Sequence, residues 1–190
     1  DIKENFIKLC KKYEINEVIK QFSNKNNNVG NSQNHYSYKE KIIIYNDIFL
    51  VNFYFEIKKY FSNKKNMILE IGGGYGGLAR IISSNINCTY VLIDLPEINL
   101  VSSYYLKSHF PNKSFLFYDK NKENENLKFE DYDFVILPPW SINKDLAFDF
   151  CINIRSMMEM NINSIDNYFK YIQNNLNIDG YFLNVNRYFS

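Results

Sequence analysis

The chain has 190 residues, of which 46% are hydrophobic and 23% are charged, and its formal net charge is +1 at pH 7. This length fits one domain with a substantial core, and the near-zero charge excludes the strong basic field typical of nucleic-acid binders. Three widely spaced cysteines, Cys10, Cys88 and Cys151, indicate neither a disulfide framework nor a zinc site. Because no apolar run reaches about 18 residues and no signal peptide opens the sequence, we expect a cytoplasmic protein without a membrane span.

Residues 1–61 are predicted to form a helical N-terminal extension interrupted by a polar loop. Apolar residues recur at helical intervals over 2–22 and again over 38–61, where Ile44, Ile48, Val51 and Phe55 are three or four positions apart. Between these helices, residues 23–34 read S-N-K-N-N-N-V-G-N-S-Q-N, a turn-prone composition typical of a loop. A turn at 62–66 leads into the second part of the chain.

Residues 67–82 combine an apolar run, five glycines in six positions and a return to helical spacing: M-I-L-E-I-G-G-G-Y-G-G-L-A-R-I-I. This pattern predicts a strand, a tight turn and a helix. Glycine accepts positive φ and lets a ligand approach bare backbone amides, and the start of the helix presents free N–H groups. We therefore expect a ligand to bind at the glycines of this turn, with an anionic group facing the amides.

Strands and helices alternate through the rest of the chain. Strands are predicted at 89–94, 134–140, 148–153 and 181–185, with a shorter one at 115–118. Helices are predicted at 78–84, 96–110 and 162–176, the last closed by Asp179 and Gly180. A charged, solvated segment is expected at 120–131, and a turn or short helix at 154–160. This alternation predicts an α/β fold with a doubly wound, Rossmann-like parallel sheet over 62–190, and a ligand at the carboxyl ends of its strands.

The glycines alone leave two ligand classes open, because Gly72, Gly74 and Gly77 also fit the G-x-G-x-x-G dinucleotide pattern. Glu70 discriminates between the classes, since a carboxylate there would repel the pyrophosphate of NAD or FAD and suit a cationic ligand such as S-adenosylmethionine. Asp94 follows Gly76 by 18 residues, close to the offset at which an acidic side chain binds ribose hydroxyls. The alternative for Asp94 is a helix cap before Pro96.

The E-x-G-x-G-x-G pattern of Glu70, Gly72, Gly74 and Gly76 is similar to motif I of the class I methyltransferases. Segments 70–80, 93–97, 148–160 and 167–188 together resemble the bacterial sugar O-methyltransferases, including I-D-L-P-E at 93–97 and S-M-M-E-M at 156–160. The resemblance implies a cytoplasmic enzyme that uses S-adenosyl-L-methionine to methylate a hydroxyl of a surface-polysaccharide sugar. It also implies the class I methyltransferase fold, and we expect this chain to lack the C-terminal strand pair of that fold.

The resemblance also assigns roles to particular residues. Glu70 would hold the ammonium of the cofactor, Asp94 would bind its ribose, and Leu95 and Trp140 would flank its adenine. The backbone at Gly72, Gly73, Gly74 and Gly76 would accommodate the cofactor's amino acid part. For Trp140, filling the core is an equal alternative.

Methyl transfer to oxygen is an in-line displacement that needs a base for the hydroxyl proton. We assign that role to Glu159, because Met157, Met158 and Met160 flank it and are expected to desolvate it. The alternative is an exposed carboxylate. Asn153 is expected to orient the hydroxyl or the cofactor. Arg187 and His35 are further candidates for the site, His109 is interpreted as a surface residue, and no metal-ligand spacing is present.

Three other interpretations remain open. L-P-P-W at 137–140 is close to a signature of methyltransferases acting on amino groups of adenine, but Leu137 replaces the polar acceptor, and no basic surface for nucleic acid is indicated. An oxidoreductase that binds a dinucleotide is compatible with the glycines alone. A non-catalytic partner protein with the methyltransferase fold is the third possibility.

Overall fold

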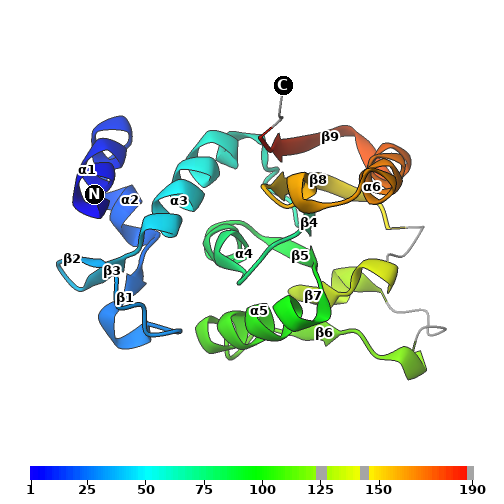
Figure 1. Ribbon diagram of the computed structural model, residues 1–190, viewed down its shortest axis with the longest axis horizontal. Helices are drawn as coiled ribbons and strands as arrows, with labels where there is room; N and C mark the ends of the chain where they lie inside the picture. The colour runs from blue at the N-terminus through cyan, green and yellow to red at the C-terminus, as the bar shows by residue number, and fades with distance from the viewer. Residues whose placement is uncertain (123–127, 142–145, 188–190) are drawn as a thin grey trace.

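The computed structural model describes residues 1–122, 128–141 and 146–187. Its centre is a six-stranded parallel sheet of order β6-β7-β5-β4-β8-β9 (Figure 1). The strands are β4 (Asn66–Ile71), β5 (Cys88–Ile93), β6 (Phe115–Phe117), β7 (Phe134–Leu137), β8 (Phe148–Ile154) and β9 (Leu176–Val185). From β4 the chain first adds β5, β6 and β7 on one side and then β8 and β9 on the other, so the strand order reverses between β4 and β8. The predicted doubly wound, Rossmann-like fold is therefore confirmed.

Helices cover both faces of this sheet. Helices α3 (Tyr45–Ile57), α4 (Gly77–Ser83) and α5 (Pro96–His109) pack on one face, where Ile68, Tyr90 and Phe134 point. Helix α6 (Ile162–Asn175) packs on the other, against Leu69, Val91 and Val135. Burial on two faces explains why the central strands are apolar at nearly every position instead of alternating.

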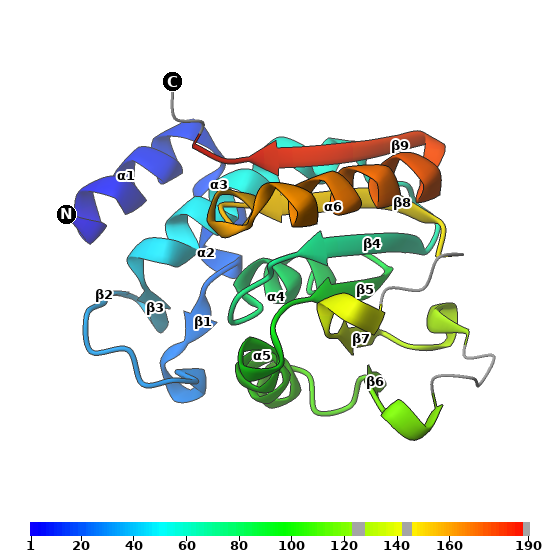
Figure 2. The same cartoon turned by 45° about the vertical axis from the view of Figure 1, so that its right-hand side comes forward.

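The N-terminal segment contains two helices, α1 (Ile2–Lys12) and α2 (Ile15–Lys20), and a small antiparallel sheet of order β1-β3-β2. Its strands are β1 (Ser23–Asn24), β2 (Tyr36–Tyr38) and β3 (Lys41–Ile43). Phe6, Val18 and Phe22 belong to the same buried cluster as Ile68 and Leu78. Figure 2 shows this segment on the side toward which the arrowheads of β4 and β9 point. The N-terminal segment therefore borders the edge of the sheet where a ligand is expected.

The predicted helix over 38–61 is wrong at its start, because α3 begins only at Tyr45. A hairpin of β2 and β3 occupies residues 36–43 instead, with Lys39 in a left-handed conformation at φ 53° in its turn. The aromatic rings of Tyr36 and Tyr38 lie on Phe6, at centroid distances of 5.9 and 5.2 Å. Alternate residues share one face of a strand, and this two-residue period was concealed by the run of isoleucines that follows.

The predicted closure of the last helix at Asp179 and Gly180 is also wrong. Helix α6 ends at Asn175, and the two residues lie inside β9. Phe148 pairs with Leu176 and Phe150 with Tyr181, so residues 177–180 form an irregularity in the strand. From Tyr181 to Val185 the strand pairs regularly with β8, as predicted.

Short 3-10 helices complete the described chain. They are η1 (Lys25–Asn27), η2 (Lys58–Tyr60), η3 (Lys120–Lys122), η4 (Phe129–Asp131), η5 (Pro139–Ser141) and η6 (Met157–Glu159). The segment predicted to be solvated at 120–131 lies partly outside the described residues, and Phe129 within it is buried at 9% exposure. Among the described helices, none is long and apolar enough to cross a membrane.

Candidate functional site

The turn after β4 is held in an unusual backbone conformation by its glycines. Gly72, Gly74 and Gly76 have φ values of 76°, 56° and 87°, which only glycine adopts without strain. A Cβ on Gly72 would lie 2.1 Å from the hydroxyl oxygen of Ser156, so this glycine faces the protein. A Cβ on Gly74 would meet nothing within 4 Å, so this glycine faces open space. The turn therefore leaves its backbone open at Gly74 and packs against the protein at Gly72.

Asp94 contacts the glycine turn directly. Its Oδ2 accepts a hydrogen bond from the backbone N–H of Gly74 at 2.9 Å, and its Oδ1 accepts one from Leu95 at 2.8 Å. Burial raises the pKa of Asp94, although both backbone hydrogen bonds oppose the shift. The residue at the N-cap of α5 is Leu95, so Asp94 is not the helix cap that sequence alone left open. Its carboxylate is part of the turn.

Glu70 lies beneath the turn and is buried at 4% exposure. The hydroxyl of Tyr90 donates to its Oε2 at 2.9 Å, and the same oxygen lies 2.9 Å from where a Cβ on Gly73 would stand. Burial raises the pKa of Glu70 to about 7, the Tyr90 hydrogen bond lowers it, and the charge of Asp94 raises it further. Glu70 is thus poised between its neutral and ionised forms. Its predicted contact with a ligand ammonium stays a prediction.

Tyr90 was missed by the sequence analysis, although the register of a parallel sheet could have found it. Glu70 pairs with Leu92 across β4 and β5, and Tyr90 is two residues earlier on the same face.

The two residues predicted to flank an adenine are both accessible. Leu95 is 56% exposed after β5, and Trp140 is 65% exposed in η5, after the neighbouring strand β7. The ring of Tyr118 meets Trp140 edge to face at a centroid distance of 6.4 Å. The interpretation of Trp140 as a core residue is therefore wrong. Its contact with adenine is untested.

Asn153 lies near the end of β8, the strand that pairs with β4. It is fully buried, and its amide nitrogen donates to the backbone oxygen of Ile71 at 2.7 Å and to the hydroxyl of Ser156. Its amide oxygen accepts from Asn186 at 2.8 Å and from the backbone N–H of Met157. These protein contacts occupy both ends of the side chain, so Asn153 orders the loop after β8.

Ser156 was also missed by the sequence analysis. Its hydroxyl donates to the backbone oxygen of Ile71 at 3.0 Å and lies 2.1 Å from where a Cβ on Gly72 would stand. The loop after β8 is thus fitted against the glycine turn, a contact that only the assembled sheet reveals.

Glu159 lies in η6 at the same edge, with an exposed side chain. The predicted enclosure by three methionines is not observed, because Met157 points into the core at 3% exposure and Met158 is 36% exposed. Arg187 is exposed two residues after β9.

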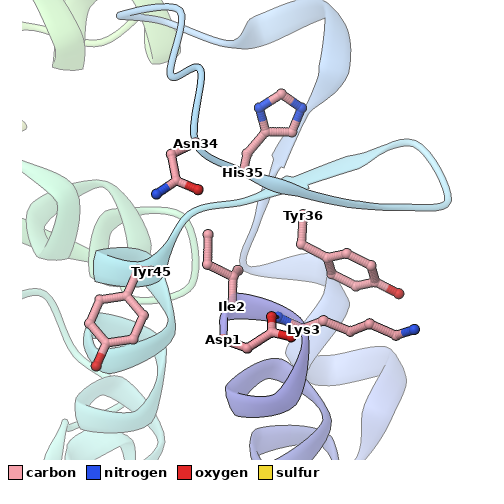
Figure 3. Close-up of a pocket in the computed structure, with 7 residues that line it drawn as sticks. All are labelled: Asp1, Ile2, Lys3, Asn34, His35, Tyr36 and Tyr45. Atoms are coloured by element: carbon pink, nitrogen blue, oxygen red, sulfur yellow. The ribbon is translucent and has the colours of Figure 1, made fainter.

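His35 does not join these residues. It lines a hollow of about 660 Å³ at the start of α1, and its ring nitrogen Nδ1 lies 2.8 Å from the backbone oxygen of Ser32. Figure 3 shows His35 and Tyr36 on one side of this hollow and Tyr45 of α3 on the other. No lining residue comes from the glycine turn.

A buried ion pair lies behind the glycine turn and was not predicted. Asp47 of α3 and Arg80 of α4 are 3% and 5% exposed, with Oδ2 and Nη2 3.5 Å apart. Tyr75, inside the turn, donates its hydroxyl to Oδ1 of Asp47 at 2.6 Å. Arg80 also donates to Tyr105 and to the backbone oxygen of Gln21, both at 2.8 Å. The pair therefore ties the N-terminal segment to the turn.

A second cavity, of about 240 Å³, opens beside this ion pair between the loop after β1 and helix α5. Its lining includes Asn28, Asp47, Tyr75 and Tyr104. His109, interpreted as a surface residue, is half-buried nearby, with its ring 3.3 Å from the hydroxyl of Ser23. Burial lowers the pKa of His109, so its neutral form is favoured.

The L-P-P-W segment follows β7, which pairs with β5 and not with β4. The backbone oxygen of Leu137 accepts from the amide of Asn99 at 2.9 Å and from the backbone N–H of Asp94. This segment is therefore separated from β4 by one strand. Within the described ranges, His, Cys, Asp and Glu form no group of three or more that could hold a metal ion.

Comparisons with known proteins identify no family: no family model matches the sequence, and no curated protein matches it either. Solved structures do match the fold. A Pyrococcus horikoshii OT3 protein is 16% identical with a TM-score of 0.49, covering 70% of this chain and 54% of its own.

Two further matches are named methyltransferases. Coclaurine N-methyltransferase, bound to N-methylheliamine and S-adenosylhomocysteine, is 13% identical with a TM-score of 0.49, covering 95% of this chain and 48% of its own. Mitomycin 7-O-methyltransferase is 12% identical with a TM-score of 0.45, covering 72% and 38%. The chain thus spans about half of these proteins or less. At these scores the matches assign no activity to it.

Proposed function

We propose that this chain is a cytoplasmic S-adenosyl-L-methionine-dependent methyltransferase that methylates a hydroxyl, and that the hydroxyl belongs to a sugar of a surface polysaccharide. One observation carries the first part. A left-handed glycine turn at the carboxyl end of β4 has Asp94 hydrogen-bonded to Gly74 and Glu70 beneath Gly73. The proposal that the acceptor is a sugar rests on the sequence resemblance over 70–80 and 148–160.

The two carboxyl groups select the charge of the ligand. S-adenosylmethionine carries an ammonium and a sulfonium, so its binding favours the ionised form of Glu70. A dinucleotide would bring its pyrophosphate against the same group and be repelled. Asp94 would bind ribose hydroxyls, and Leu95 and Trp140, which are both exposed, would contact an adenine. The backbone of Gly72, Gly73, Gly74 and Gly76 would line the cofactor, and Gly74 is the position with open space beside it.

When bound, the cofactor supplies a methyl group on a sulfonium, whose sulfur leaves with the electron pair of the broken carbon–sulfur bond. This chain supplies the base and the alignment. Glu159, exposed at the carboxyl edge beside β8, would accept the proton of the acceptor hydroxyl as its oxygen forms the new bond. Asn153 acts as a positioning residue, because it fixes the loop that leads to Glu159.

A turnover assay tests this proposal. The protein is incubated with S-adenosylmethionine and panels of neutral and charged sugars, and S-adenosylhomocysteine is measured. Glu159→Gln should lower turnover by about 100-fold while leaving cofactor affinity unchanged. Asp166→Asn, which removes an exposed carboxylate on α6, is the matched control and should leave turnover unchanged. Equal turnover in Glu159→Gln would remove Glu159 as the base.

The same assay separates the alternatives. Turnover with amines and not with sugars would assign the chain to amino-group methylation. Cofactor binding without turnover on either panel would favour a non-catalytic partner protein.

A further inference from the structure

Arg155, the residue after β8, has a left-handed backbone at φ 63°. A non-glycine residue in this region costs about 1 kcal/mol or more, and such residues persist where the surroundings hold them. Here the backbone N–H of Arg155 donates to Val185 at 2.8 Å, while the next residue, Ser156, is bonded to Ile71. Neighbours on both sides therefore fix Arg155 in this conformation.

The side chain of Arg155 is also held in place. Its guanidinium lies over the ring of Phe49 at 5.5 Å, and Phe49 meets Tyr45 edge to face at 4.9 Å. Stacking on an aromatic face orients a guanidinium and leaves its N–H groups free for a ligand. Within the described part of the chain, no carboxylate forms an ion pair with Arg155, and the residue is exposed. This guanidinium therefore lies against Phe49 and is accessible to a ligand.

A second arginine follows the adjacent strand. Asn186 is clamped by hydrogen bonds to Asn153 at 2.8 Å and to the backbone N–H of Met158 at 3.2 Å. Arg187 comes next and is exposed. Arg155 and Arg187 thus follow the carboxyl ends of the neighbouring parallel strands β8 and β9. Glu159, the residue after Met158, lies at the same edge of the sheet.

The glycine turn separates these arginines from the predicted nucleoside site. Asp94, Leu95 and Trp140 follow β5 and β7 on one side of β4, whereas Arg155 and Arg187 follow β8 and β9 on the other. A group bound by the arginines therefore lies on the same side of β4 as Glu159, the proposed base.

We propose that Arg155, assisted by Arg187, binds an anionic group of the acceptor, a phosphate or a carboxylate. The inference rests on the proposed function and narrows it, because it selects acidic or phosphorylated acceptors over neutral ones. Guanidinium groups bind both anions through paired N–H donors.

Phosphate binding measured by phosphorus NMR, with and without saturating S-adenosylhomocysteine, tests this inference. The variants are Arg155→Asn, since asparagine tolerates the left-handed backbone, and Arg155→Lys and Arg187→Gln. Phosphate affinity should fall about tenfold or more in Arg155→Asn and several-fold in Arg187→Gln, and Arg155→Lys should retain part of it. Lys170→Gln, which removes an exposed cation on α6, should bind phosphate like the wild type.

S-adenosylhomocysteine affinity provides the second readout and should be unchanged in every variant. Phosphate binding that is equal in Arg155→Asn and the wild type, or absent in the wild type, would overturn the inference. Loss of S-adenosylhomocysteine affinity in Arg155→Asn would overturn it as well, because the guanidinium would then hold the cofactor's own carboxylate. Should the wild type bind no S-adenosylhomocysteine, the proposed function fails, and phosphate binding without it still reports on the arginines.

Discussion

Glu70 shows how burial sets the chemistry of one residue. Its carboxyl group is enclosed under the glycine turn, and its pKa of about 7 lies above the ordinary value of 4.5. Below pH 7 the empty protein therefore holds this group mostly neutral. A bound ammonium favours the ionised form, so binding must expel a proton below that pH.

The first prediction concerns this proton. The affinity for S-adenosylhomocysteine should rise as the pH increases from about 5 to 7 and level off above it, because ionisation no longer opposes binding. Glu70→Gln should bind more weakly at pH 8 and lose the dependence over this range. Calorimetry in buffers of different ionisation enthalpy measures both the affinity and the released proton. Parallel pH profiles for the two proteins would contradict a contact between Glu70 and the ligand.

Asp94 provides the second prediction. Asp94→Ala should weaken S-adenosylhomocysteine binding by about 1 to 3 kcal/mol, since a ribose hydroxyl loses a charged acceptor. The substitution also removes the hydrogen bond from Gly74. Adenosine and homocysteine, titrated separately, distinguish the causes: ribose contact predicts that only adenosine binding weakens. An unchanged affinity for all three compounds would exclude Asp94 from the site.

At the scale of elements, the glycine turn functions as a unit whose positions face different surroundings. Gly74→Ala should cost about 1 kcal/mol in backbone strain, because Gly74 has φ 56°, but it should leave the fold intact, because nothing lies within 4 Å of the new Cβ. It should abolish ligand binding by covering the backbone. Gly72→Ala should destabilise the protein, since its Cβ would overlap Ser156. Thermal unfolding and calorimetry separate the two effects.

Gly30→Ala is the matched control for Gly74→Ala. Gly30 has φ 87° and equally open surroundings but belongs to the loop after β1, so its substitution introduces similar backbone strain without changing a residue of the turn. Ligand binding that survives in Gly74→Ala as it does in Gly30→Ala would show that the turn does not hold the ligand.

The buried ion pair joins two elements and provides the fourth prediction. Asp47→Ala should lower the free energy of unfolding by about 3 to 5 kcal/mol, because Arg80 would stay buried without its counter-charge. Urea unfolding followed by circular dichroism measures the change. The exposed pair of Lys8 and Glu4 is the control, and Glu4→Ala should have a far smaller effect. An equally small effect of Asp47→Ala would mean that water reaches Arg80.

At the scale of the whole molecule, the central elements could be predicted because their signals are local. The apolar run and glycines of 67–82 specify a strand and a turn by themselves. The hairpin at 36–43 was missed because its tyrosines and isoleucines fit a helical period as well as a strand period. The irregularity at 177–180 depends on pairing with β8, which no local pattern records.

The parts of the site that sequence did not reveal come from contacts across long stretches of chain. Tyr90 on Glu70, Ser156 on Gly72 and Asp47 on Arg80 are each brought together only by the assembled sheet and its helices. Residue identity suggested Glu70 and Asp94 because a carboxylate beside a glycine turn has a direct electrostatic meaning. Residue identity could not predict that Glu159 is exposed, because this depends on which of the neighbouring methionines is buried in the core. In the structure that methionine is Met157.

Glu70, a carboxylate beneath the glycine turn, is expected to select a cationic methyl donor over a dinucleotide. Parallel calorimetric titrations of the protein with S-adenosylhomocysteine and with NAD at pH 8 measure this selectivity. We expect saturable binding of S-adenosylhomocysteine and none of NAD, and we expect Gly74→Ala to bind neither. Tight binding of NAD that strengthens in Glu70→Gln, with no binding of S-adenosylhomocysteine, would contradict it.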